Sequence, residues 1–151
     1  MKEAPRRPLW KTILVIAIMV PIALLHFITG SQYQGPFPLF VNGYLIDILL
    51  PFGFYFLLCL SENGMLKSPI VRGLLLFSAA SFVELAQYRG IPLLGRTYDP
   101  WDFVMYGLGV LLAMLCDQLL FPRLFSFWQS ESPITMSEHD REDELFIWRH
   151  N

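Results

Sequence analysis

Residues 83–113, VELAQYRGIPLLGRTYDPWDFVMYGLGVLLA, bring most of the chain's polar chemistry between two apolar runs. Glu84 and Gln87 lie three residues apart at the end of the first run, a spacing that places both on one face of a helix. Asp102 and Tyr106 follow at i and i+4 on the next run, again on one face. The stretch therefore predicts a helical hairpin that gathers carboxylates and an amide at one end.

The connection between the two runs is rich in turn-forming residues and carries Arg96 and Asp99. Asp99 is expected to cap the second helix, with Pro100 at its first position, where the missing N–H is harmless. A guanidinium can bind a carboxylate or a phosphate through two parallel hydrogen bonds. Arg96 is therefore the predicted counter-ion of Glu84 or Asp102.

The rest of the sequence indicates a membrane scaffold. Of its 151 residues 54% are apolar and only 16% are charged, whereas soluble domains carry about 25% charged residues. The apolar residues form four runs, each about as long as a membrane-crossing helix of roughly 17 to 25 residues: 12–29, 39–60, 69–88 and 101–121. The sequence therefore predicts an all-α, multi-pass protein of the cell membrane, with a bundle of four transmembrane helices within residues 12–122.

The flanks of this bundle predict its orientation. Residues 1–11 are basic, and residues 123–151 are expected to form a mobile, acidic cytoplasmic tail. Seven basic residues precede the first run, flank the second loop or follow the last run, whereas only Arg89 and Arg96 lie in the third loop. By the positive-inside rule both termini are cytoplasmic, and the hairpin end near Glu84 faces outward. No basic face remains to bind nucleic acid.

Three further polar side chains lie inside the runs. Asp47 lies about eight residues into the second run, roughly 12 Å along a helix, where a carboxylate costs about 2.5 to 3.5 kcal/mol on insertion scales. It is expected to face the bundle interior and to have a partner such as Arg96 or Tyr106. His26 lies near the outer end of the first run and is expected on the same side of the membrane as the hairpin end. Asp117 lies about one turn from the inner end of the last run and is expected to extend to water.

Together these residues predict an outward-facing polar site that binds a ligand. The predicted ligand-binding residues are His26, Asp47, Glu84, Gln87, Arg96, Asp102 and Tyr106. Structural alternatives exist for several: Asp102 can stabilise a helix start, Asp47 can lock helix packing, and His26 can form a hydrogen bond in the core. The histidine and carboxylates lack metal-ligand spacing, and no phosphate-binding or nucleophile motif occurs, so no metal or cofactor is predicted.

This motif also resembles that of a known family. The pattern E-x-x-Q at residues 84–87, then Arg96 with five residues before Asp102, then Gly109, resembles the pattern of VanZ-like bacterial integral membrane proteins. The plan of several short hydrophobic spans is similar too, although Tyr106 stands where the family often has Asn. The family's namesake is linked to resistance to the glycopeptide teicoplanin. The resemblance therefore implies a cell-envelope protein that affects susceptibility to glycopeptide antibiotics.

Three function classes remain open at this stage. In the first, the polar site binds a membrane lipid or lipid-linked envelope molecule, with Arg96 on an anionic head group. In the second, the protein is a small intramembrane enzyme that uses Glu84 or Asp102 as general acid or base. In the third, the polar residues only hold together an assembly subunit, which functions with a protein partner or as a homo-oligomer.

Overall fold

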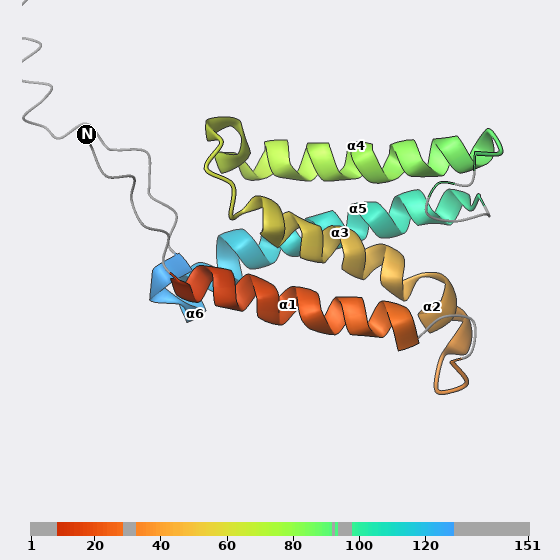
Figure 1. Cartoon of the computed structure of the whole chain (residues 1–151), viewed down its shortest axis with the longest axis horizontal. Helices are drawn as coiled ribbons and strands as arrows, with labels where there is room; N and C mark the ends of the chain where they lie inside the picture. The colour runs from red at the N-terminus through yellow and green to blue at the C-terminus, as the bar shows by residue number, and fades with distance from the viewer. Residues whose placement is uncertain (1–8, 29–32, 92, 94–97, 129–151) are drawn as a thin grey trace, which may run out of the picture.

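The computed structural model describes residues 9–28, 33–91, 93 and 98–128. These residues form helices and connections, with no strand among them (Figure 1). The helices are α1 (Leu9–Ile28), α2 (Pro38–Gly43), α3 (Leu45–Leu58), α4 (Pro69–Tyr88), α5 (Pro100–Leu115) and α6 (Phe121–Leu124), with a π-helical turn (Cys116–Leu120) between α5 and α6 and 3₁₀ turns at Gly64–Lys67 and Ser126–Trp128.

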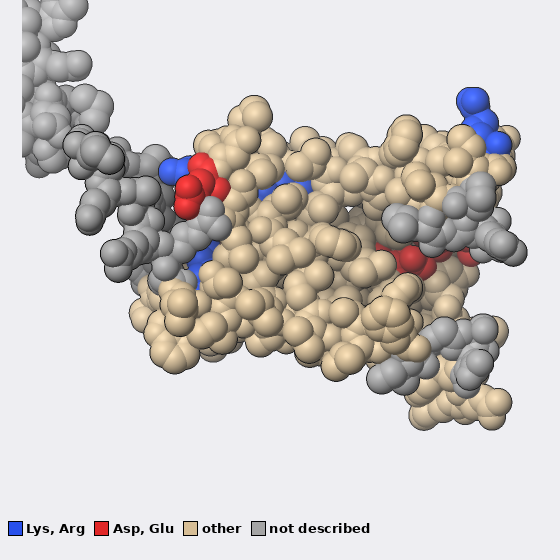
Figure 2. All heavy atoms as spheres, in the orientation of Figure 1, with Lys and Arg blue, Asp and Glu red and all other residues tan. Residues whose placement is uncertain are grey.

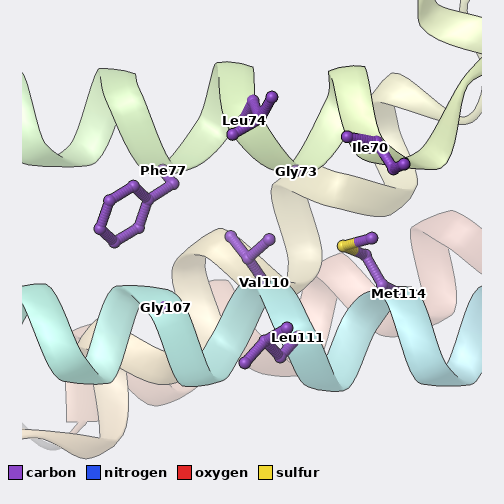
Figure 3. Close-up of a pocket in the computed structure, with 8 residues that line it drawn as sticks. All are labelled: Ile70, Gly73, Leu74, Phe77, Gly107, Val110, Leu111 and Met114. Atoms are coloured by element: carbon purple, nitrogen blue, oxygen red, sulfur yellow. The ribbon is translucent and has the colours of Figure 1, made fainter.

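Three helical segments are long and apolar enough to cross a membrane. They are α1, α4 and the continuous segment from α5 through α6. Their outer faces carry many exposed apolar side chains; Leu74 on α4 and Leu111 on α5, for example, are 62% and 59% exposed. A shallow, wholly apolar groove of about 290 Å³ lies between these two helices near both leucines (Figure 3). The prediction of an all-helical chain is thus confirmed for the described residues, and three of the four predicted spans correspond to segments long and apolar enough to cross a membrane.

The second apolar run differs from the prediction of one helix over residues 39–60. It forms α2 and α3, with a break at Tyr44, where φ is −120° and ψ is −23°. The two residues before the break, Asn42 and Gly43, are weak helix formers. Asn42 also donates a side-chain hydrogen bond to the carbonyl oxygen of Tyr33 at 3.0 Å. With 14 residues, α3 extends about 21 Å, less than a bilayer core of about 30 Å.

The helices lie side by side, with α3 between α1 and the α4–α5 pair (Figure 1). Glycines allow the close approaches. Gly109 of α5 lies directly against the carbonyl oxygen of Ile48 on α3, leaving no room for a Cβ. A Cβ at Gly53 of α3 would lie 2.7 Å from the sulfur of Met19 on α1. Small residues at such contacts are typical of helix packing in membranes, where dispersion contacts replace the hydrophobic effect.

The two ends of this bundle differ in chemistry. At the end that holds α6, called here the α6 end, aromatic side chains form the largest apolar cluster, in which Phe56 stacks on Phe121 with ring centroids 4.9 Å apart. Trp128 joins this cluster and is only 2% exposed. Phe125, Phe127 and Trp128, which the prediction assigned to the tail, therefore pack against the bundle, while residues 129–151 of the predicted tail lie outside the described residues. The opposite end, where α2 lies, α4 ends and α5 begins, is called the α2 end.

Candidate functional site

A cavity of about 840 Å³ opens at the α2 end, between α2, α3, α4 and the start of α5. Figure 2 shows acidic side chains recessed in a hollow at this end of the molecule. The walls are apolar apart from a group of polar side chains: Asn42, Tyr44, Asp47, Glu84, Gln87, Asp99, Asp102 and Tyr106. We call this the acidic cavity, because four of these residues are carboxylates and none of its described lining residues is Lys, Arg or His.

Glu84 joins the end of α4 to the start of α5. Its side chain has no exposed surface. One carboxylate oxygen accepts a hydrogen bond from the backbone N–H of Asp99 at 2.7 Å, and the other accepts one from the hydroxyl of Tyr106 at 3.4 Å. Glu84 therefore acts as a positioning residue for the helix that carries Asp102. The geometry does not favour the predicted direct acid–base role, since both oxygens are already engaged.

Asp99 caps α5 as the sequence predicts. Its side chain accepts a hydrogen bond from the backbone N–H of Trp101 at 3.0 Å, and Pro100 begins the helix. Its second carboxylate oxygen accepts a hydrogen bond from the hydroxyl of Tyr44 at 3.3 Å. Tyr44, at the break between α2 and α3, is thereby tied to the start of α5. The sequence reasoning missed Tyr44, although its position three residues before Asp47 could have indicated it.

Asp47 and Asp102 are the carboxylates of the cavity that have no partner among the described residues. Both are half-buried and line the cavity, and neither side chain forms a hydrogen bond or ion pair with any described residue. Asp47 lies in the first turn of α3 and Asp102 in the first turn of α5, where the helix dipole favours a negative charge. The predicted pairing of Asp47 with Tyr106 is wrong, because Tyr106 donates to Glu84.

The remaining predicted site residues divide into three cases. Gln87 lines the cavity and uses its side-chain amide to donate to the carbonyl oxygen of Leu93 at 3.0 Å, which holds the chain after α4. His26 does not reach the cavity; it is exposed on α1, with its ring centroid 5.8 Å from that of Phe27. Arg96, the predicted counter-ion, lies outside the described residues.

The positioning role of Glu84 makes a prediction about stability. Glu84→Ala would leave the backbone N–H of Asp99 and the hydroxyl of Tyr106 without an acceptor, so it is expected to lower the free energy of unfolding by about 1 to 3 kcal/mol. Glu84→Gln keeps a carbonyl oxygen for Asp99 and is expected to cost much less. Denaturation of the purified variants in detergent measures both. Equal destabilisation by Ala and Gln would instead assign the role to the negative charge.

A second polar cluster lies at the α6 end and contains Asp117. The prediction that Asp117 extends to water is therefore wrong. Asp117 is 7% exposed and pairs with the buried Arg72, whose Nη2 lies 2.6 Å from a carboxylate oxygen. The hydroxyl of Tyr55 donates to the same oxygen at 3.0 Å, and the indole N–H of Trp128 donates to the other at 2.9 Å. The sequence could have indicated this pair. Arg72 and Asp117 are opposite charges inside two different apolar runs, and charges inside a membrane are tolerated best when they are paired.

This Arg72–Asp117 cluster joins four parts of the chain: α3, α4, the π-helical turn and the segment after α6. All four side chains are buried and joined to one another, and the Nε of Arg72 is their one fully buried polar atom without a hydrogen-bond partner among the described residues. The acidic cavity is therefore the candidate site. Among the described residues, no group of three or more His, Cys, Asp or Glu side chains is arranged to hold a metal ion. Compared with protein-family models, with curated proteins and with solved structures, the chain matches none.

Proposed function

We propose that this chain is a multi-pass protein of the cell membrane, similar to VanZ-like proteins, whose acidic cavity binds an envelope lipid or a lipid-linked precursor. The observation that carries the proposal is the cavity itself: about 840 Å³, with apolar walls and two carboxylates that pair with no described residue. An amphipathic ligand needs this combination, since apolar walls supply most of the contact and a few polar groups fix its orientation. As the VanZ resemblance implies, such binding would affect susceptibility to glycopeptide antibiotics.

The broken helix supports the location of this site within a four-span bundle. In the proposed topology α2 and α3 together form one span, the second along the chain, which is interrupted at Tyr44. With the three longer segments it completes a bundle of four. Non-helical backbone is tolerated at membrane depth where it lines a cavity or is buried in protein, and both Gly43 and Tyr44 line the acidic cavity. With both termini cytoplasmic, the cavity would open toward the outer leaflet, where lipid-linked envelope precursors are used.

A cavity-filling variant tests the proposal. Native mass spectrometry of the purified wild type is expected to show a discrete bound lipid. Ala80→Trp places a large ring in the cavity wall and is expected to abolish that lipid. Ala17→Trp, on an exposed face of α1 away from the cavity, is expected to retain it.

Circular dichroism establishes that both tryptophan variants are folded before their lipids are compared. The proposal would be overturned by a folded wild type that carries only a heterogeneous lipid population, identical in mass distribution to that of Ala80→Trp. In that case the polar residues would serve the assembly of the bundle, and a protein partner would be the next target.

A further inference from the structure

The hydrogen-bonding groups of the acidic cavity are unbalanced. Each of its described side-chain donor groups already makes one hydrogen bond: Tyr44 donates to Asp99, Tyr106 to Glu84, and Gln87 to the carbonyl oxygen of Leu93. Only the second N–H of an amide, as on Gln87, is left over. The described part of the cavity therefore has more open acceptor oxygens than donors, and none of its donors carries a positive charge.

Three acceptor groups remain open. Two are the carboxylates of Asp47 and Asp102, which have no partner among the described residues. The third is the Oδ1 of Asn42, which is buried and accepts no hydrogen bond from any described residue. The amide of Asn42 is held in one orientation, because its Nδ2 donates to the carbonyl oxygen of Tyr33 at 3.0 Å. Buried acceptors without a donor are rare in folded proteins and call for a specific explanation, such as a ligand.

Charge narrows the chemistry of such a ligand. Four carboxylates line the cavity, and no described basic side chain offsets them. An anionic group would be repelled there, and a neutral hydroxyl would leave the charges uncompensated. A primary ammonium supplies one positive charge and three N–H donors on a single atom, which suits two carboxylates.

We infer that the ligand of the acidic cavity carries a primary ammonium group, as an aminophospholipid head group does, held by Asp47 and Asp102. This rests on the proposed lipid-binding function and specifies its ligand class. Asp47 comes from the first turn of α3 and Asp102 from the first turn of α5, so an ammonium between them would bridge the two helices. Glu84 and Asp99 contribute indirectly, because their hydrogen bonds hold the start of α5 in place.

The test compares three lipids with the same acyl chains. Phosphatidylethanolamine has a primary ammonium, phosphatidylcholine has a cation without N–H donors, and phosphatidylglycerol has hydroxyl donors and a net negative charge. Equimolar amounts are added to the delipidated protein, and the bound species are counted by native mass spectrometry. Wild type is expected to retain phosphatidylethanolamine about tenfold over the other two, a ratio that corresponds to about 1.4 kcal/mol.

The variants separate charge from shape. The double variant Asp47→Asn/Asp102→Asn keeps side-chain size and breaks no hydrogen bond among the described residues, and it is expected to lose the preference. Glu62→Gln removes a carboxylate from the loop after α3, at the α6 end. This variant is expected to keep the preference for phosphatidylethanolamine. Ethanolamine alone is titrated into the same protein to distinguish a lipid from a soluble amine.

Each outcome is decisive. A discrete lipid that is not phosphatidylethanolamine, or a preference unchanged in the double variant, would overturn the ammonium inference and leave the proposed lipid-binding function standing. Absence of any discrete lipid, with ethanolamine bound in an Asp47-dependent and Asp102-dependent manner, would overturn the lipid function and keep the ammonium. If wild type binds neither ethanolamine nor a discrete lipid, both proposals fall.

Discussion

Asp117→Ala is expected to lower the free energy of unfolding by about 3 to 5 kcal/mol, because it leaves a buried positive charge without its partner. The side chains of Arg72 and Asp117 are only 9% and 7% exposed. The substitution also removes the acceptor for Tyr55 and Trp128. Unfolding of the purified protein in detergent, followed by circular dichroism, measures the loss.

A double variant supplies the control for this prediction. Arg72→Met/Asp117→Leu removes both charges and fills similar volume, and replacing a whole buried ion pair in this way is often neutral or stabilising. It is expected to unfold at higher denaturant than Asp117→Ala alone, despite carrying more substitutions. If Asp117→Ala were as stable as wild type, the pair could not be a buried charge pair, and the position of Trp128 would need another explanation.

Gly109→Ala is expected to destabilise the bundle by about 1 to 3 kcal/mol, as overpacking of a tight contact commonly does. A Cβ at this position would overlap the backbone carbonyl of Ile48, so α3 and α5 would have to move apart. Because Asp47 and Asp102 lie on these two helices, the same variant is expected to lose the bound lipid. Denaturation in detergent and native mass spectrometry measure the two effects.

Gly107→Ala is the matched control, two residues earlier on the same helix. A Cβ there would meet only a ring carbon of Phe77 at 3.6 Å, an ordinary contact. Since Ala is a better helix former than Gly, this variant is expected to be neutral or slightly stabilising. Similar behaviour of the two variants would show that the contact between Gly109 and Ile48 does not limit the approach of α3 and α5.

The motif that resembles VanZ-like proteins has a physical explanation in this structure at several positions. Glu84 holds the start of α5, Gln87 holds the chain after α4, and Gly109 permits the approach of α3. Among the described motif residues, Asp102 is the one whose side chain forms no hydrogen bond with another described residue.

The sequence alone determined the features that depend on local chemistry. Apolar runs of membrane-crossing length predicted four spans, and three of them correspond to helical segments long and apolar enough to cross a membrane. Such runs favour helices because hydrocarbon satisfies no backbone polar group. The Asp99-Pro100 pair predicted the start of α5, because capping and the fixed φ of proline act within a few residues. The spacing of Glu84 and Gln87 correctly predicted that both lie at the end of one helix, beside the acidic cavity.

Only the tertiary structure decided which polar groups are satisfied and which are free. Arg72 and Asp117 are 45 residues apart, and no local pattern shows that two distant helices bring their charges together. Tyr44, at the break between α2 and α3, likewise donates its hydrogen bond to Asp99, 55 residues away. In the sequence Asp47 and Glu84 look alike, as single acids within apolar runs, yet Glu84 accepts two hydrogen bonds whereas Asp47 has no partner among the described residues. The physical reason is that the cost of a buried charge depends on its partners in space, which sequence separation does not specify.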